Sequence, residues 1–367
     1  MFFQEHCLVS SEDLAGKCPP PRHVSPFARE YERIFHQGQA SGQVIFHPEK
    51  SDLDAPKETK AGPVRVTKVK GLADDFYSSL LDWQGSSIVF ALDERVFVQN
   101  FLTGRTSLIA RLSSTYITSV KICPGSSTVA LGTCTGDIAL VDLDGKALTR
   151  KHQHKSRVGV LEWNGKQLLS GSRDRTIKYL DPRTPDDSRS VMAHTQEVCG
   201  LSFSATGAYL ASGGNDNKVF ILDGRSHNSI LHTITAHKAA VKAIGWCPER
   251  TDVLATGGGT ADRTVKMWKV SGTAEELLGS IDYGSQVCNL RWTKHHELIT
   301  THGYSQNDIR LLDITRHRQV RIFEGHKNRV IHFGMSTDEE YFATGSGDET
   351  VCVWRARDND LGNFMMR

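Results

Sequence analysis

One turn signature recurs seven times along this chain of 367 residues. In each copy a turn residue is followed three positions later by Val or Ile and then by a short apolar segment, as in DNKVFILD and DRTVKMW. The seven turn residues are Asp93, Thr135, Asp174, Asp216, Asp262, Gln306 and Asp348. Successive copies lie 39 to 46 residues apart. Units of about 40 to 45 residues are typical of the four-stranded blades of a propeller.

Each unit carries further features of a WD repeat. A histidine stands upstream of the turn in several units, for example His194, His237 and His326. A strand of small residues lies between the histidine and the turn, as in LASGGND and FATGSGD. β-Branched and polar residues alternate between Gly-rich turns, which predicts strands throughout. The sequence therefore predicts an all-β fold, a seven-bladed WD-repeat β-propeller over residues 64–356.

The two ends of the chain differ in composition from the repeats. Residues 1–63 include CPPPRHVSP, QGQASGQ and KSDLDAPKETKAGP, which are rich in Pro, Gly and charged residues. Such segments bury too little apolar surface to offset the entropy of ordering. We therefore expect a disordered N-terminal arm over residues 1–63 and a C-terminal tail over residues 357–367.

Histidine, Ser or Thr, and Asp recur together, and this combination allows two interpretations. One is a hydrolase triad. The other is the hydrogen-bond network that pins each WD blade and satisfies a buried Asp. We favour the structural interpretation, because an enzyme needs its active site only once. The sequence also has no G-x-S-x-G, Walker or H-E-x-x-H motif, so we expect no enzyme activity and no cofactor.

Charge and hydropathy argue against several classes of partner. The 44 Lys and Arg residues nearly balance the 42 Asp and Glu residues, and no long basic run supplies the contacts that nucleic acids need. No apolar stretch approaches the roughly 18 residues that cross a membrane, and the start does not match a secretory signal. The eight cysteines include no C-x-x-C pair, which argues against a metal site. We expect a protein of the cytoplasm and nucleus without nucleic-acid or membrane partners.

Several longer motifs carry a more specific resemblance. They include GLADDFYSSLLDW, KSRVGVLEWNGKQLLSGSRDRTI, SGGNDN, LATGGGTADRTVKMW, SQVCNLRW and HGYSQND, in this order. Over about residues 71–354 the chain resembles the Fizzy and Fizzy-related coactivators of the anaphase-promoting complex, a ubiquitin ligase. Its departures from the family pattern are those of a specialised member, similar to the insect cortex proteins of meiosis.

The resemblance implies a binding site for a KEN-box peptide on the upper face of the propeller. The residues that match the family's site are Asp75, Asn215, Asn217, Thr260, Gln286 and Arg329. Asp75 suits the peptide lysine and Arg329 the glutamate, while the amides and the hydroxyl suit the asparagine and the peptide backbone. A simpler interpretation is that Asn215 and Asn217 only tolerate a left-handed turn.

The resemblance also implies a second site, for the destruction box, between the first and last blades. We assign Glu349, Lys68, Phe90 and Gln99 to it. Glu349 matches a carboxylate that binds the motif's arginine, and Phe90 belongs to the apolar pocket for its leucine. Lys68 stands where the family has Asp, and Gln99 replaces a tryptophan. A cation repels the arginine, so we expect destruction-box binding to be weakened.

The ends of the chain depart from the family as well. Family members reach the ligase through an N-terminal C-box and a C-terminal Ile-Arg tail. The segment nearest to a C-box is RHVSP, from Arg22 to Pro26, and the sequence ends in Met366-Arg367. We expect Met366 and Arg367 to take the place of the Ile-Arg tail. Ser25, which precedes a proline, is a candidate phosphorylation site.

Two functions remain open at this point. The resemblance implies a substrate-recognising activator of the anaphase-promoting complex in mitosis or meiosis. Its partners would be subunits of that complex and degron-bearing substrates such as cyclins or securin-like proteins. The alternative is a WD-repeat scaffold or inhibitory paralogue that binds degron-like peptides without activating the ligase.

Overall fold

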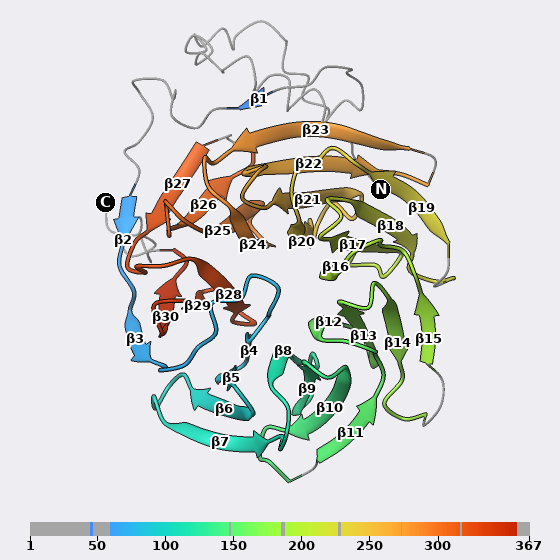
Figure 1. Cartoon of the computed structure of the whole chain (residues 1–367). Helices are drawn as coiled ribbons and strands as arrows, with labels where there is room; N and C mark the ends of the chain where they lie inside the picture. Colours follow the sequence, from blue (N-terminus) through green and yellow to red (C-terminus); the bar gives the residue numbers. More distant parts are fainter. Residues whose placement is uncertain are drawn as a thin grey trace, which may run out of the picture. The chain divides into compact units, whose positions relative to one another are not determined.

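The computed structural model describes residues 59–146, 148–184, 188–226, 229–272, 274–315 and 318–357, and the backbone of residues 45–46. The chain divides into two compact units, Met1–Ala40 and Ser41–Arg367, and every described residue belongs to the second. The described residues form strands and turns, with no helix among them. They contain seven sheets, which are arranged as the blades of a ring (Figure 1).

Blades 1 to 4 each consist of four consecutive antiparallel strands. Blade 1 contains β4 (Leu81–Gln84), β5 (Ser87–Leu92), β6 (Arg95–Asn100) and β7 (Thr106–Arg111). Blade 2 contains β8 (Ile117–Ile122), β9 (Thr128–Thr133), β10 (Asp137–Asp142) and β11 (Leu148–His152). Blade 3 contains β12 (Val158–Asn164), β13 (Gln167–Ser172), β14 (Ile177–Leu180) and β15 (Ser188–Val191). Blade 4 contains β16 (Val198–Phe203), β17 (Tyr209–Gly214), β18 (Val219–Asp223) and β19 (Ile230–Ile234).

Blades 5 to 7 add strands from the beginning of the described chain. Blade 5 contains β20 (Val241–Trp246), β21 (Val253–Gly258), β22 (Thr264–Val270), β23 (Glu275–Asp282) and the short β1 (Ile45–Phe46). Blade 6 contains β24 (Val287–Trp292), β25 (Glu297–His302), β26 (Ile309–Asp313), β27 (Arg318–Phe323) and β2 (Thr59–Ala61). Blade 7 contains β28 (Val330–Met335), β29 (Tyr341–Ser346), β30 (Thr350–Arg355) and β3 (Arg65–Lys68). The predicted all-β, seven-bladed propeller is confirmed.

Strand β3 closes the ring. It pairs antiparallel with β30, with Arg65 opposite Val353 and Lys68 opposite Thr350. The last blade is therefore completed by the segment that precedes the first blade. Strands β1 and β2 instead pair in parallel with β23 and β27, although both lie in the range that the sequence analysis assigned to the arm. Residues 1–44, 47–58 and 358–367 fall outside the described residues.

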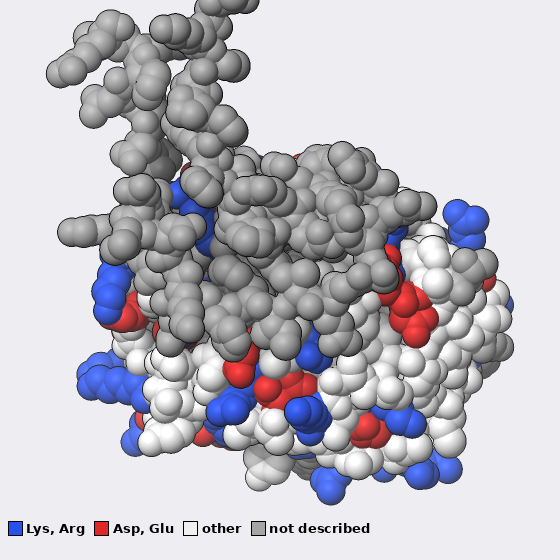
Figure 2. Space-filling model, turned by 90° about the horizontal axis from the view of Figure 1, so that it is seen from above, with Lys and Arg blue, Asp and Glu red and all other residues white. Residues whose placement is uncertain are grey.

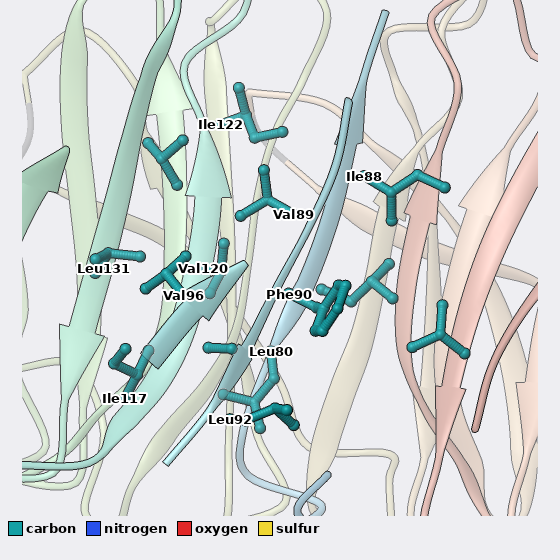
Figure 3. Close-up of a cluster of buried hydrophobic side chains, with 14 of the residues drawn as sticks. Leu80, Ile88, Val89, Phe90, Leu92, Val96, Ile117, Val120, Ile122 and Leu131 are labelled. Atoms are coloured by element: carbon teal, nitrogen blue, oxygen red, sulfur yellow. The ribbon is translucent and has the colours of Figure 1, made fainter. Parts of the chain in front are cut away.

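The hydrophobic core lies between neighbouring blades. Every residue of β5 after the half-buried Ser87 is buried, as expected for a strand whose sheet is covered on both faces. Figure 3 shows Val89 and Phe90 of β5 in one cluster with Val120 of β8. The same cluster extends to Val351 of β30. It therefore packs blades 7, 1 and 2 together where the ring closes.

A repeated polar network fixes four of the blades. In each, the histidine Nδ1–H donates to the turn aspartate, and Nε2 contacts a strand hydroxyl. The four sets are His154 with Asp174 and Ser170, His194 with Asp216 and Ser212, His237 with Asp262 and Thr256, and His326 with Asp348 and Thr344, at 2.7 to 3.1 Å. The recurring His, Ser or Thr and Asp are thus structural, as the sequence analysis favoured.

Blades 2 and 6 have different polar contacts at this position, because their turn residues, Thr135 and Gln306, are not aspartates. In blade 2, Asp137 accepts hydrogen bonds from Arg150 Nε at 3.0 Å and from His152 Nδ1 at 2.8 Å. In blade 6, the Nε2 atom of buried His302 lies 2.9 Å from Thr300 Oγ1. Burial lowers the pKa of His302 well below its ordinary value. This imidazole is therefore neutral at physiological pH.

Acid is expected to destabilise the propeller by protonating the network aspartates. Burial alone would raise the pKa of Asp216, but hydrogen bonds from His194 and the Thr195 amide lower it from 3.8 to about 2. A carboxyl with a depressed folded-state pKa stabilises the fold above its unfolded pKa. That contribution is lost as the pH falls from about 4 to about 2. Urea unfolding, followed by tryptophan fluorescence at decreasing pH, should show this loss.

The Asp216→Asn variant provides the control for this prediction. It should be less stable at neutral pH, because the neutral amide is a weaker partner for His194. It should also lose less stability between about pH 4 and pH 2 than the unchanged chain does. Equal acid sensitivity in the two proteins would contradict the role assigned to Asp216.

Candidate functional site

The segment 69–80, between β3 and β4, runs from the outer edge of blade 7 into the centre of the ring (Figure 1). His332 of β28 anchors it at two points: its Nε2–H donates to Ala73 O at 3.0 Å, and its Nδ1 accepts from the Leu80 amide at 3.2 Å. Burial lowers the pKa of His332 to about 3, so the ring is neutral and Nδ1 can accept. Lys242 Nζ donates to Ser78 O at 2.7 Å. We call residues 69–80 the axial segment.

The axial segment holds Asp75 by several hydrogen bonds. Its Oδ1 accepts from the Tyr77 amide at 3.0 Å, and its Oδ2 accepts from the Ser78 hydroxyl at 2.8 Å. Arg157 Nη1 donates to Oδ2 at 2.9 Å. Burial would raise the pKa of Asp75, but these hydrogen bonds and the charges of Arg157 and Lys242 lower it. Asp75 is therefore a carboxylate at neutral pH.

Arg157 connects Asp75 with a second carboxylate. Its Nε and Nη2 donate to Glu197 at 2.6 and 2.7 Å, a bidentate pair. Its guanidinium lies 5.2 Å from the centre of the Tyr77 ring, which favours a cation–π interaction. The hydrogen bonds to Glu197, together with its charge, raise the pKa of Arg157 against the effect of burial. Arg157, Glu197 and Tyr77 thus belong to this site, although the sequence analysis did not assign them to it.

The two candidate asparagines have different roles in the structure. Asn215 lies beside the axial segment: its Oδ1 accepts from the Tyr77 hydroxyl at 2.6 Å, and its Nδ2 donates to Gln196 at 2.7 Å. Asn217 has a φ of 64°, in the left-handed region that Asn tolerates. The corresponding turn residues of blades 3, 5 and 7, Arg175, Arg263 and Glu349, also have positive φ. Turn geometry therefore accounts for Asn217, whereas Asn215 contacts the axial segment.

The remaining candidates come from blades 5, 6 and 7. Arg329 donates from Nε to the Asp74 carboxylate at 3.1 Å and from Nη2 to Asp74 O at 3.0 Å. Gln286 lies close by, because a Cβ added at Gly303 would meet Gln286 Oε1 at 2.8 Å and Arg329 Cδ at 3.6 Å. Thr260 is exposed in the loop between β21 and β22. The structure thus joins Asn215 and Arg329 directly to the axial segment, which itself carries Asp75.

A common position explains how four of these side chains reach the centre. Each stands immediately before the first, innermost strand of its blade. They are Arg157 before β12, Glu197 before β16, Gln286 before β24 and Arg329 before β28. The sequence signal is therefore a polar residue directly before the Val that begins the inner strands of blades 3, 4, 6 and 7. It could have identified Arg157 and Glu197 without any structure.

The residues assigned to the destruction-box site lie where blades 7 and 1 meet. Lys68 of β3 is exposed and pairs with Thr350, next to the exposed Glu349. Glu349 accepts a hydrogen bond from the Gly71 amide at 3.1 Å. Phe90 is 3% exposed and stacks on Phe97 within the core.

Gln99 is also buried, at 3% exposure. Its Nε2 donates to Thr67 Oγ1 at 3.2 Å and to Thr106 Oγ1 at 3.3 Å. Gln99 therefore joins β6 of blade 1 to β3 of blade 7 in place of an aromatic side chain. Its polar atoms are satisfied within the protein, as burial requires.

The remaining sequence candidates at the two ends of the chain have no structural description. Ser25, the segment Arg22–Pro26, Met366 and Arg367 lie outside the described residues. Within the described part of the chain, no three His, Cys, Asp or Glu residues are placed to hold a metal ion, and no helix is suited to crossing a membrane. On the described part of the face in Figure 2, acidic and basic side chains are interspersed.

The sequence matches one protein family over most of its length. A family model of the CDC20/Fizzy WD40 domain matches residues 68–354. The chain is 41% identical over 300 residues to APC/C activator protein CDH1 of Saccharomyces cerevisiae, covering 81% of this chain and 52% of that protein. It is 35% identical over 320 residues to meiotic fizzy-related protein 1 of Schizosaccharomyces pombe, covering 86% and 74% respectively.

The fold matches a solved structure equally well. A chain of the crystal structure of the mitotic checkpoint complex superposes with a TM-score of 0.78 at 35% sequence identity. The match covers 84% of this chain and 99% of that one. Against the Saccharomyces cerevisiae relative and the Schizosaccharomyces pombe protein srw1, the chain spans only about half of their length, 52% and 55%.

Proposed function

This chain belongs to the CDC20/Fizzy family of WD40 propellers, and we propose that it is a substrate-recognising activator of the anaphase-promoting complex. It is a binding protein rather than an enzyme, as its membership of this propeller family indicates. The name of the Saccharomyces cerevisiae relative, an APC/C activator, supports the proposed role. The observation that carries the proposal is that the axial segment brings its own Asp75 together with Asn215 and Arg329 of two different blades.

These groups offer what a peptide with the sequence Lys-Glu-Asn requires. Asp75 is an ionised acceptor for the ammonium, and its side chain is 34% exposed. Arg329 uses Nε and Nη2 for Asp74, so its Nη1 can donate to the peptide glutamate. Asn215, which is half-buried, can exchange hydrogen bonds with the peptide asparagine and backbone. Because the groups come from different blades, only the closed ring brings them together.

The peptide-binding proposal predicts different effects for the two asparagines. The full chain should bind a Lys-Glu-Asn peptide with micromolar affinity, about −8 kcal/mol. Asn215→Ala should weaken binding by about 1 to 3 kcal/mol, because it leaves peptide groups unpaired. Asn217→Gly should bind almost normally, since Gly keeps the positive φ. Fluorescence polarisation with a labelled peptide would measure this, and unchanged affinity in Asn215→Ala would refute the site.

Recruitment of the ligase distinguishes an activator from a scaffold or inhibitory paralogue. We propose that Met366-Arg367 serves in place of the family's Ile-Arg tail. If the chain is an activator, it should co-precipitate subunits of the complex, and removal of Met366 and Arg367 should weaken that association. A deletion of residues 1–44, which leaves β1 and β2 in place, is the matched comparison for the tail deletion. Peptide binding without any recovered ligase subunit would instead support the scaffold.

Charge repulsion between Lys68 and the arginine of a destruction-box peptide predicts that the chain prefers Lys-Glu-Asn peptides. Lys68 and Glu349 are both exposed, so their interactions with peptide charges are screened and amount to roughly 1 kcal/mol or less each. We expect a destruction-box peptide to bind more weakly than a Lys-Glu-Asn peptide. Lys68→Asp should strengthen destruction-box binding by about threefold to tenfold. Glu349→Ala in that background should reverse the gain.

The destruction-box test can be kept clear of folding effects. Changing Gln99 to Trp as well would break its bonds to Thr67 and Thr106, so Lys68→Asp is tested first by itself. Isothermal titration with both peptides provides the comparison. Equal affinity of the unchanged protein for the two peptides would show that Lys68 does not weaken this site.

A further inference from the structure

We propose that Glu197 is a positioning residue that holds Arg157 and so leaves Asp75 able to bind a peptide ammonium. This inference rests on the proposed peptide-binding function and assigns a selectivity role to a residue outside the six matched positions. It starts from the observation that one guanidinium serves two carboxylates. Arg157 makes a bidentate pair with Glu197 and a single contact with Asp75.

The geometry commits Arg157 mainly to Glu197. A carboxylate and a guanidinium match best when two parallel hydrogen bonds form. Arg157 makes such a pair with Glu197 through Nε at 2.6 Å and Nη2 at 2.7 Å. Only Nη1 reaches Asp75, at 2.9 Å. The Tyr77 ring, 5.2 Å from the guanidinium carbon, further fixes the plane of the side chain.

Asp75 therefore keeps room for another donor. A carboxylate has about four acceptor positions, and those of Asp75 receive the Tyr77 amide, the Ser78 hydroxyl and Arg157. Its side chain is 34% exposed, whereas that of Glu197 is only 7% exposed. A peptide ammonium can approach Asp75 but not Glu197. The two carboxylates thus have different roles: Asp75 can contact the peptide lysine, and Glu197 binds Arg157.

The local charge balance gives the second argument. Lys242 is a further cation near Asp75, and burial lowers its pKa to about 8, so it remains largely protonated at neutral pH. Asp75, Glu197, Arg157 and Lys242 together carry no net charge. Without the charge of Glu197 the group would be positive, and Arg157 could turn toward Asp75. Both changes disfavour binding of the peptide ammonium, which would be a third cation beside Arg157 and Lys242.

A cycle of protein and peptide changes tests this role. Glu197→Gln should weaken binding of a Lys-Glu-Asn peptide to the full chain by about tenfold, the size expected for one screened charge. A peptide with norleucine in place of lysine has no ammonium to repel. Its affinities for the unchanged chain and for Glu197→Gln should therefore agree within about twofold. The matched control Glu276→Gln changes an exposed carboxylate on β23 and should leave both peptides unaffected.

A double variant distinguishes an effect of the Glu197 charge from a structural effect of the substitution. Glu197→Gln with Arg157→Gln removes both charges and should recover most of the lysine-dependent affinity. Equal weakening of both peptides by Glu197→Gln, or no recovery in the double variant, would overturn the inference while leaving the peptide site itself intact. If the unchanged chain binds neither peptide, the proposed function fails and this inference fails with it.

Discussion

The pairing of β3 with β30 is the contact on which both the fold and the site depend. A propeller blade buries both faces against its neighbours, so an open ring would expose the apolar sides of its first and last blades. Four residues of β3 close that gap by backbone hydrogen bonds to β30. The same stretch of chain then continues directly into the axial segment, which carries Asp75. Closing the ring and positioning the candidate site are therefore consequences of one strand register.

The candidate site is preorganised by internal partners. Asp75 is held by Arg157, Arg329 by Asp74, and Asn215 by Tyr77. Such pairs fix the side chains before a ligand arrives, which lowers the entropy cost of binding. They also mean that a peptide gains only the difference between new and existing contacts. For the proposed peptide, we therefore expect a weak affinity that depends on matching charges.

Much of this structure could be predicted from the sequence, and the exceptions have physical reasons. The 39- to 46-residue spacing predicts the blades, because each blade repeats four short strands joined by turns, and four of the seven blades repeat the same buried histidine network. Strands β1 and β2 were missed because parallel additions of two or three residues leave no alternating pattern. For Gln99 the sequence shows only that it replaces a tryptophan of the family. It does not reveal that Thr67 and Thr106 satisfy the Gln99 amide.

The site residues divide in the same way. The positive φ of Asn217 could be predicted from its place in the turn, because the residue after the turn aspartate has positive φ in blades 3, 4, 5 and 7. Arg157 and Glu197 were missed because their signal is a position relative to the inner strand rather than a residue type. The contacts of buried His332 and Lys242 with the axial segment could not be inferred from the sequence. His332 must be neutral to accept from the Leu80 amide, while Lys242 beside it remains largely protonated to donate to Ser78 O. The charge of Lys242 helps burial to keep His332 neutral, so the two groups together set the path of the axial segment.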